Sequence, residues 1–231
     1  MITVTVQEMK RIEELAKEYF GVDEIQLMEN AGRQVARMAR EMAGNRKAIT
    51  ILCGKGNNGG DGLVASRFLS NWGNNVNIIT PFHPEEMKKL TKDHYGTATS
   101  MHLNRMTGVD NLKWELAIRQ SDLLIDGLIG YGLKGDPEGQ LGGLIKLANN
   151  SGKKILSIDC PSGLDCDTGT AMNPCIRADR TITLGIVKKG LLKNKTHAGR
   201  LYLADIGIPK EVFELAGMRP PDFQKEDVVK V

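Results

Sequence analysis

A run of glycines and asparagines fills residues 54–62, directly after an apolar segment that ends at Cys53. Gly54, Gly56 and Gly59 have the G-x-G-x-x-G spacing that, between a strand and a helix, brings backbone N–H groups close to a phosphate. An ordinary turn does not need five glycines and two asparagines within nine residues. The run is therefore predicted to be a loop that cradles a phosphate at the start of a helix.

Polar side chains in the same run add to this chemistry. Asn57 and Asn58 supply fixed amide donors and acceptors, and Asp61 either caps the following helix or binds a hydroxyl group of a ligand. No Gly-Lys-Ser/Thr follows, which argues against a Walker-type site. The next apolar segment ends at Thr80 and continues with Pro-Phe-His. It therefore lacks the acid that holds the ribose in a standard NAD dehydrogenase.

A second glycine-rich segment begins at Asp126. Gly130, Gly132 and Gly135 repeat the glycine spacing, and Lys134 is available to pair with a phosphate as a point charge. Two segments of this kind in one domain suit a ligand that carries a diphosphate. Asp126 itself ends an apolar run, and a buried carboxylate needs hydrogen-bond donors, a cation or a proton.

A third segment, Asp159-Cys160-Pro161-Ser162-Gly163, follows another apolar run. Burial at the end of a strand raises the pKa of a carboxyl group toward the range useful for acid/base catalysis, so Asp159 is a candidate acid/base group. Pro161 and Gly163 force a sharp turn that aims the Ser162 hydroxyl into the same crevice. A Ser-His-Asp hydrolase is not indicated, because the Gly-x-Ser-x-Gly pattern is absent here.

Together the three segments would bring amides, two carboxylates, a hydroxyl and several carbonyl oxygens to one crevice. Oxygen donors without histidine or thiolate suit a hard cation rather than zinc. The four cysteines, at 53, 160, 166 and 175, have no Cys-x-x-Cys spacing. They are expected to be free thiols.

The elements that must position these segments follow from the spacing of apolar residues. Thr5 and Glu8 form a capping-box pair at the start of an amphipathic helix that ends at Gly21, and a second helix stops near Gly44. From Ala48 onward, short apolar runs alternate with helical stretches, which is typical of βαβ units and a parallel sheet. Strands are predicted at 49–53, 76–80, 123–128, 155–160, 181–184 and 201–204, and helices at 63–72, 84–95 and 141–149. The stretch 97–115 is ambiguous, and the predicted fold is an α/β sandwich of three layers with a mostly parallel central sheet and two N-terminal helices.

Composition and charge exclude several classes of protein. The chain has 231 residues, of which 41% are hydrophobic and 26% charged, as in globular rather than disordered or fibrous proteins. A net charge of +3 is too small to indicate nucleic acid or an anionic membrane as a partner. No apolar run is long enough to span a bilayer, and the start lacks a signal-peptide pattern, so the expected location is the cytoplasm.

The combination of motifs resembles a known family, the NAD(P)H-hydrate epimerases, also called the YjeF N-terminal domain family. The likeness runs from about residue 5 to residue 215. Four motifs occur in the family's order, at residues 27–32, 57–62, 126–136 and 159–163. The resemblance implies a Rossmann-like α/β/α domain.

The resemblance also implies an isomerase that interconverts the R and S forms of NADHX and NADPHX, the hydrates of the reduced cofactors. Members act jointly with a dehydratase that accepts only the S form, and in many relatives the two are fused. They bind a potassium ion, K+, and commonly form homodimers. Acceptance of both hydrates accounts for the missing ribose acid, because an acid there would repel the 2′-phosphate of NADPHX.

Site residues follow by motif position. The resemblance implies substrate contacts at Asn57, Asn58, Gly59, Gly60, Asp61, Gly130, Tyr131, Gly132, Leu133, Lys134, Gly135, Asp136 and Asp159. It implies potassium ligands at Asn58, Asp126 and Ser162. Asp159 is the hypothesised acid/base group for inversion at C6 of the nicotinamide ring. Lys188 lies in a segment that resembles the family near the site but receives no role, and Glu29 and Asn30 are expected to pack the helices or a dimer contact.

Residues 1–217 are predicted to form the epimerase domain, and 218–231 a tail. The residues alone favour a frayed terminus for the tail, whereas the resemblance favours a stub of the linker to a fused dehydratase. Two other function classes stay open. A nucleotide hydrolase or kinase would need a nucleophile or a phosphate clamp that is not found, and a non-catalytic interaction module would tend to lose Asp126 and Asp159.

Overall fold

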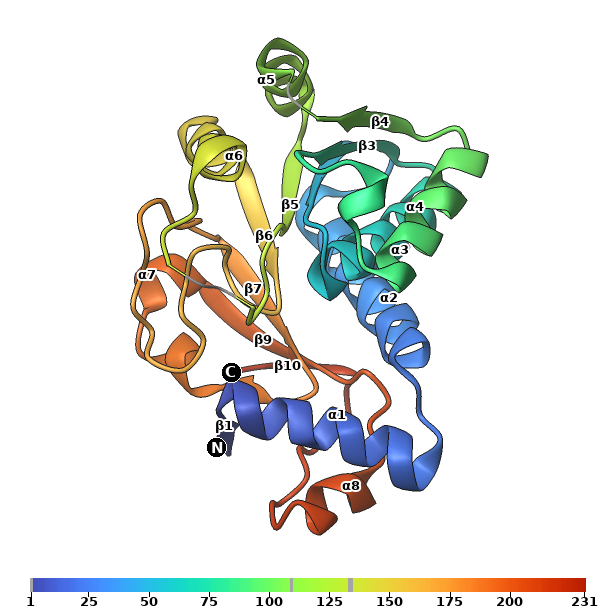
Figure 1. Cartoon of the computed structure of the whole chain (residues 1–231), viewed down its shortest axis with the longest axis vertical. Helices are drawn as coiled ribbons and strands as arrows, with labels where there is room; N and C mark the ends of the chain where they lie inside the picture. The colour runs from blue at the N-terminus through green and yellow to red at the C-terminus, as the bar shows by residue number, and fades with distance from the viewer. Residues whose placement is uncertain (1, 109, 133–134) are drawn as a thin grey trace.

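A mostly parallel sheet forms the centre of the computed structural model, which describes residues 2–108, 110–132 and 135–231. Its strands are β2 (Ala48–Cys53), β3 (Asn75–Thr80), β4 (Asn104–Thr107), β5 (Leu123–Gly127), β6 (Lys154–Ile158), β7 (Arg180–Leu184), β9 (Arg200–Ala204) and β10 (Val228–Lys230). They lie in the order β10-β9-β7-β6-β5-β2-β3-β4 (Figure 1). All neighbouring pairs are parallel except β9 and β10.

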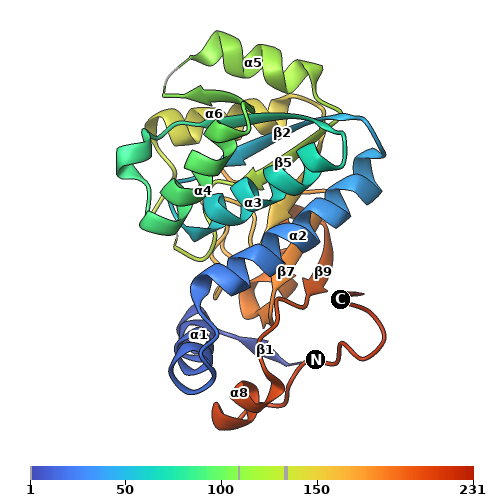
Figure 2. The same cartoon turned by 90° about the vertical axis from the view of Figure 1, so that its right-hand side faces the viewer.

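Helices cover both faces of this sheet (Figures 1 and 2). On one face lie α2 (Glu24–Ala43), α3 (Asn57–Asn71) and α4 (Lys89–Ser100), and on the other α5 (Asn111–Gln120) and α6 (Gly139–Asn150). Each face has its own buried apolar cluster, one built with α2 and α3 and the other with α5 and α6. The predicted three-layer α/β/α fold is confirmed. Within the described ranges, no helix combines the length and apolarity that crossing a membrane requires.

The N-terminal helix α1 (Val6–Phe20) lies at one end of the molecule beside α8 (Lys210–Leu215) (Figure 2). The predicted capping box is present: the Glu8 N–H donates to Thr5 Oγ1 at 3.2 Å, and the Thr5 N–H donates to Glu8 Oε2 at 2.6 Å. The strand before the helix, β1 (Thr3–Val4), pairs in parallel with β8 (Val187–Lys188). The remaining helical elements are short: η1 (Pro84–Glu86), η2 (Lys189–Leu192) and α7 (Lys195–Ala198).

The direction of chain travel through the sheet reverses beside β2. From β2 the chain runs outward through β3 to β4, and it then returns to place β5 on the opposite side of β2. Connections from β2 and β5 therefore diverge at their carboxyl ends and leave a crevice, which is where open α/β sheets bind ligands. The glycine-rich segments after β2 and β5 both open into this crevice.

Several predicted boundaries need correction. Helix α3 begins at Asn57 rather than at residue 63, so most of the predicted phosphate loop is the first two turns of a helix. Residues 84–86 form a separate 3₁₀ turn, and α4 extends to Ser100. The ambiguous stretch contains a strand, β4, and the start of α5. The sequence predicts the start of α3 too late because glycines are poor helix formers. Tertiary packing overrides that preference here.

The glycines of this run are required by close packing. A Cβ atom at Gly54 would overlap the carbonyl oxygen of Leu128, and one at Gly59 would overlap the carbonyl oxygen of Gly54. At Gly60 it would lie 2.6 Å from the sulfur of Met28 on α2. The start of α3 thus lies in direct contact with the ends of β2 and β5.

The C-terminal segment is part of the sheet. Strand β10 pairs antiparallel with β9, the Val231 N–H donates to the Leu201 carbonyl at 3.0 Å, and Asp227 accepts a 2.8 Å bond from Arg37 of α2. A frayed terminus is therefore wrong for residues 227–231. The domain boundary at residue 217 stays a prediction.

The expectation of four free thiols is wrong for one pair. Cys160 and Cys166 form a disulfide, because the turn closed by the Leu164 N–H and the Pro161 carbonyl folds the chain back on itself. Cys53 and Cys175 are free and buried.

Replacing Gly59 by alanine tests the close packing. We expect Gly59→Ala to lower the free energy of unfolding by about 3 kcal/mol, because the backbone around the new methyl group cannot move aside easily. Gly96, inside α4, meets no atom within 4 Å and is the matched control. Gly96→Ala should raise stability by about 0.5–1 kcal/mol through helix propensity. Urea unfolding measures both, and equal stability of Gly59→Ala and wild type would contradict the packing argument.

Candidate functional site

A cavity of about 750 Å³ opens at the carboxyl ends of the central strands. Its volume lies within the range of pockets that bind small molecules. It is lined by the following predicted substrate residues: Asn57, Asn58, Asp61, Gly130, Tyr131, Gly132, Gly135, Asp136 and Asp159. The three segments that the sequence singled out therefore converge on one cavity.

Four predicted contacts are not among the residues that line the cavity in the described structure. Gly59 and Gly60 are buried against Gly54 and Met28, so they position α3 rather than line the cavity. Leu133 and Lys134 lie outside the described residues. Asp61 sits in the second turn of α3, whose N-cap is Gly56, so the interpretation of Asp61 as a helix cap is wrong.

The backbone places Asp159 at the end of β6 in an uncommon conformation. Its φ angle is 58°, in the left-handed region that residues other than glycine rarely adopt. Such strain persists only where the surroundings hold it, and it concentrates at functional sites. Here the Asp159 N–H donates to the Ile182 carbonyl of β7 at 2.8 Å, which turns the side chain away from the strand.

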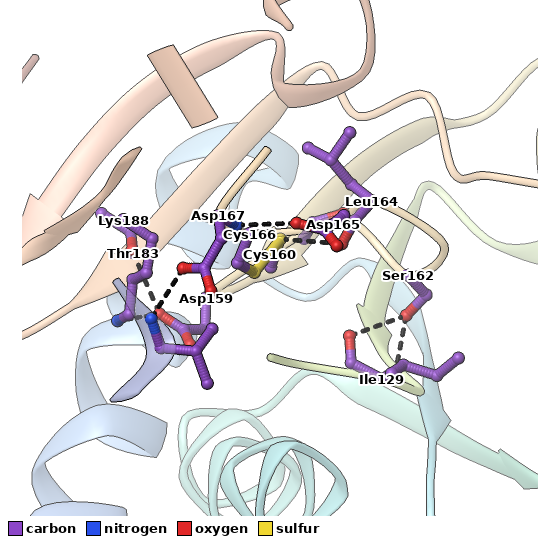
Figure 3. Close-up of a disulfide and its surroundings, with 12 residues drawn as sticks. Ile129, Asp159, Cys160, Ser162, Leu164, Asp165, Cys166, Asp167, Thr183 and Lys188 are labelled. Carbon is purple, nitrogen blue, oxygen red and sulfur yellow. Dashed lines mark hydrogen bonds and ion pairs between the residues drawn. A yellow bond between two sulfur atoms is a disulfide. The ribbon is translucent and has the colours of Figure 1, made fainter. Parts of the chain in front are cut away.

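Three donors hold one oxygen of the Asp159 carboxylate. Oδ1 accepts from Lys188 Nζ at 2.5 Å, from Thr183 Oγ1 at 3.1 Å and from the Leu184 N–H at 3.1 Å. Figure 3 shows Lys188 and Thr183 approaching Asp159 from the same side, next to the disulfide. None of the described residues donates a hydrogen bond to Oδ2. The three bonds therefore fix the carboxylate through one of its two oxygens, and Asp159 lines the cavity.

Lys188 is the positively charged partner of Asp159. Its side chain is 1% exposed, and Nζ also donates to the Leu184 carbonyl at 2.8 Å. A buried ammonium is stable only when it is paired and hydrogen-bonded, as it is here. Its charge compensates the carboxylate beside it.

Two of the other carboxyl groups that line the cavity have raised pKa values. Burial raises the pKa of Asp61 well above its usual range, and the negative charges of Asp159 and Glu13 add to this effect. Burial likewise raises the pKa of Glu13, which lies on α1. Glu13 accepts a hydrogen bond from the hydroxyl of Tyr131, at 2.9 Å from Oε2. The cavity therefore contains carboxyl groups in very different electrostatic environments.

Asp126 lies behind the cavity wall and is fully buried. Its carboxylate accepts hydrogen bonds from Ser162 Oγ at 2.5 Å, the Ser162 N–H at 2.9 Å and Ser157 Oγ at 2.8 Å. The Ser162 hydroxyl in turn accepts from the Ile129 N–H at 2.8 Å, as Figure 3 shows. Burial raises the pKa of Asp126 in spite of these bonds, because they neutralise only part of the cost of burying the charge.

The residues predicted to hold potassium fit a hard monovalent cation. Asn58 lies against the end of β5 and the residues that follow it. Its backbone carbonyl oxygen is 2.9 Å from the Cβ position at Gly127, and its side-chain Oδ1 is 3.3 Å from the Cβ position at Gly130. The Asn58 Nδ2 is buried and has no partner among the described residues. The oxygens of the Asn58 side chain, Ser162 and Asp126 are hard donors, which suit a hard cation, and Ser162 Oγ lies 2.5 Å from Asp126 Oδ1.

Sequence reasoning assigned no role to two residues of the cavity wall. No function is predicted for Lys188, and none of the motifs includes Glu13. Glu13 follows Met9 by one helical turn, and both line the cavity. A carboxylate on the apolar face of an amphipathic helix was the available signal. Glu29 and Asn30, by contrast, join helices and loops as expected: Glu29 pairs with Arg67, and Asn30 donates to the Ile206 carbonyl at 2.9 Å. A dimer contact for them stays a prediction.

The fold and the site define a Rossmann-like α/β domain with a cavity at the carboxyl ends of its central strands. More particularly, the chain belongs to the family described as YjeF-related protein N-terminus, whose model matches residues 24–190.

Named relatives agree with this assignment. The chain is 36% identical to the NAD(P)H-hydrate epimerase of Elusimicrobium minutum, with 92% of this chain and 98% of that protein covered. It is also 36% identical to the bifunctional NAD(P)H-hydrate repair enzyme Nnr of Moorella thermoacetica, covering 92% of this chain but only 42% of the relative. The chain thus spans less than half the length of this bifunctional relative. The crystal structure of yeast YNL200c has the same fold, with a TM-score of 0.87, 22% identity and full coverage of both chains.

Removing the ammonium tests its pairing with Asp159. We expect Lys188→Met to lower the free energy of unfolding by about 3 kcal/mol, because it leaves a buried carboxylate uncompensated. The double variant Lys188→Met/Asp159→Asn removes both charges and should recover most of this loss. Urea unfolding of the three proteins measures the effect. If the single variant is as stable as wild type, the pair does not compensate a buried charge.

Proposed function

We propose that the chain is an epimerase that interconverts the R and S forms of NADHX and NADPHX. The observation that carries this proposal is the Asp159 carboxylate, which is fixed through one oxygen by Lys188 and its neighbours and lines a dinucleotide-sized cavity. The names of relatives that the chain covers almost completely support the same reaction.

Inversion at C6 of the hydrated nicotinamide ring exchanges the face that carries a hydroxyl group. In this proposal Asp159 Oδ2 accepts the proton of the C6 hydroxyl as the C6–N1 bond breaks, which leaves a carbonyl at C6 and the electron pair on the ring nitrogen. The nitrogen then adds to the other face of that carbonyl, and Oδ2 returns the proton to the oxygen, while Lys188 keeps the carboxylate oriented and charge-balanced. General acid/base catalysis of this kind typically contributes about 10²–10⁴-fold in rate.

The remainder of the cavity suits a dinucleotide. Gly56, Asn57 and Asn58 line the cavity at the N-terminus of α3, where the first backbone N–H groups of a helix have no partner within the helix, and helix N-termini attract phosphates. Lys55 and Lys88 lie on the same wall. The diphosphate would lie against this wall, between the exits of β2 and β5.

A potassium ion is part of the proposal. Asn58, Asp126 and Ser162 would hold it, and it would supply positive charge next to Asp126 at the junction of the strand exits. The network of Asp126 with Ser162 and Ser157 already orients the donors within the chain.

We also propose that an S-specific dehydratase is the functional partner. The name of the bifunctional relative, a hydrate repair enzyme, supports this proposal. A homodimer and a cytoplasmic location remain predictions. The alternative of a nucleotide hydrolase or kinase still lacks the sequence pattern of a nucleophile or a phosphate clamp. The alternative of a non-catalytic interaction module is disfavoured because Asp126 and Asp159 are both present and Asp159 is paired with the buried Lys188.

Replacing Asp159 tests the catalytic assignment. In a mixture of R and S NADPHX with an S-specific dehydratase, the wild-type protein should accelerate consumption of the R form. Asp159→Asn should lower kcat by about 10²–10⁴-fold because the amide cannot accept the proton. Substrate consumption followed by absorbance measures both rates.

Asp93→Asn, on the exposed face of α4, is the control and should retain full activity. Normal rates for a correctly folded Asp159→Asn protein would remove Asp159 from the mechanism. A wild-type protein that consumes the R form no faster than spontaneous epimerisation would instead favour a binding module.

Exchanging the salt tests the potassium site. We expect KCl to raise Tm by about 5 °C over tetramethylammonium chloride at equal ionic strength, because an ion that binds only the folded state stabilises it. Ser162→Ala and Asn58→Ala should each reduce this difference, while the surface variant Asp93→Asn should keep it. Differential scanning fluorimetry measures the shift, and equal Tm values in both salts would contradict a potassium site.

A further inference from the structure

A residue outside the family's matched segment reaches the cavity. Glu13 belongs to α1, which ends at Phe20, whereas the family model begins at residue 24. The hydroxyl of Tyr131 lies 2.9 Å from Oε2 and 3.2 Å from Oε1 of Glu13, and both residues line the cavity. Burial raises the pKa of both groups. Two polar side chains, 118 residues apart in the chain, thus satisfy each other at the cavity wall.

Tyr131 stands in the segment that joins β5 to α6 and covers one side of the cavity. The Ile129 N–H donates to Ser162 Oγ at 2.8 Å, and the Asp136 carboxylate accepts from the Asn173 N–H at 2.9 Å. Between these two bonds the Tyr131 ring packs against the apolar clusters at the end of the sheet and on α1, and its hydroxyl donates to Glu13. The hydrogen bond to Glu13 therefore sets the direction of a side chain that is already packed.

Helix α1 is a rigid platform for this anchor. Ile12 and Leu15, on either side of Glu13, are buried in a cluster with Phe213 of α8. The strand before the helix pairs with β8, which carries Lys188. Glu13 therefore stands at a fixed position relative to the Asp159 pair, and a hydrogen bond to it fixes Tyr131 as well.

We propose that Glu13 is a positioning residue of the dinucleotide site, which acts through the Tyr131 hydroxyl to hold Tyr131 and the adjoining Gly132 against the bound ligand. The nature of the ligand rests on the proposed function. Because Glu13 orders a binding segment and does not move a proton, its loss should weaken binding and raise KM while kcat changes little. A hydrogen bond to a charged group corresponds to about a tenfold change in affinity.

The experiment measures binding of NADPH, which shares the dinucleotide but is not epimerised, by isothermal titration calorimetry. The proteins are wild type, Glu13→Ala, Glu13→Gln, Tyr131→Phe and the double variant Glu13→Ala/Tyr131→Phe. Glu14→Ala is the matched control, since Glu14 lies next in the same helix but is exposed and contacts only Arg11 among the described residues. Tm values and steady-state kinetics accompany each titration.

If Glu13 acts through Tyr131, Glu13→Ala, Tyr131→Phe and the double variant all bind about tenfold more weakly, by the same factor. Glu13→Gln keeps an acceptor oxygen and restores most of the affinity, and Glu14→Ala binds like wild type. Two results overturn the proposal: wild-type affinity for both Glu13→Ala and Tyr131→Phe, or an effect of the double variant equal to the product of the two single effects. If Glu13→Ala fails to fold, Glu13→Gln and Tyr131→Phe decide, because both keep the volume of the side chain.

The outcome is separable from that of the proposed function. A wild-type protein that binds NADPH but does not epimerise NADPHX contradicts the epimerase and leaves the anchor open to the same titrations. A wild-type protein that epimerises, with an unchanged KM in both Glu13→Ala and Tyr131→Phe, contradicts the anchor alone.

Discussion

Direct contact between backbones at the ends of β2 and β5 is the constraint on which the site depends. The carbonyl oxygens of Leu128 and Gly54 occupy the space where side chains would stand at Gly54 and Gly59. Only glycine permits this approach. It brings the start of α3 into the crevice, so that helix N–H groups and Asn58 reach the cavity while Asp126 stays sealed behind it. The glycines shape the cavity indirectly, because they allow α3 to approach the ends of β2 and β5 closely.

Charge is distributed unequally among the carboxyl groups that this packing brings together. Asp159 is paired directly with the Lys188 ammonium, whereas burial and the charges of Asp159 and Glu13 raise the pKa of Asp61 in spite of the opposing effect of Lys188. Environments that differ in this way give chemically identical carboxyl groups different affinities for a proton. The direct pairing with buried Lys188 is what sets Asp159 apart from Asp61.

The sequence predicts the layers, most strands and the three converging segments, because apolar periodicity and strand-end chemistry are local properties. It misplaces the start of α3, since the helix at Asn57 is stabilised by contacts with β5 and α2 that lie far away in the chain. Similarly, β10 has a weak pattern of its own and is defined by its partner β9. The spacing of residues in the sequence does not mark Glu13 or Lys188 as residues of the site. Their roles arise from long-range contacts with Tyr131 and Asp159, which no local pattern records.

The exit of β3 explains how this site differs from that of a dehydrogenase with a similar sheet. There the ribose-binding acid of dehydrogenases is replaced by Phe82, with Lys55 Nζ 5.1 Å from the centre of its ring, and both residues line the cavity. An acid at this position selects hydroxyl groups and repels a phosphate, whereas a lysine beside an aromatic ring accepts either. Under the proposed function, Lys55 would serve the phosphates of either hydrate, and Asp159 and Lys188, which β6 and β8 hold, would serve the nicotinamide end of the ligand.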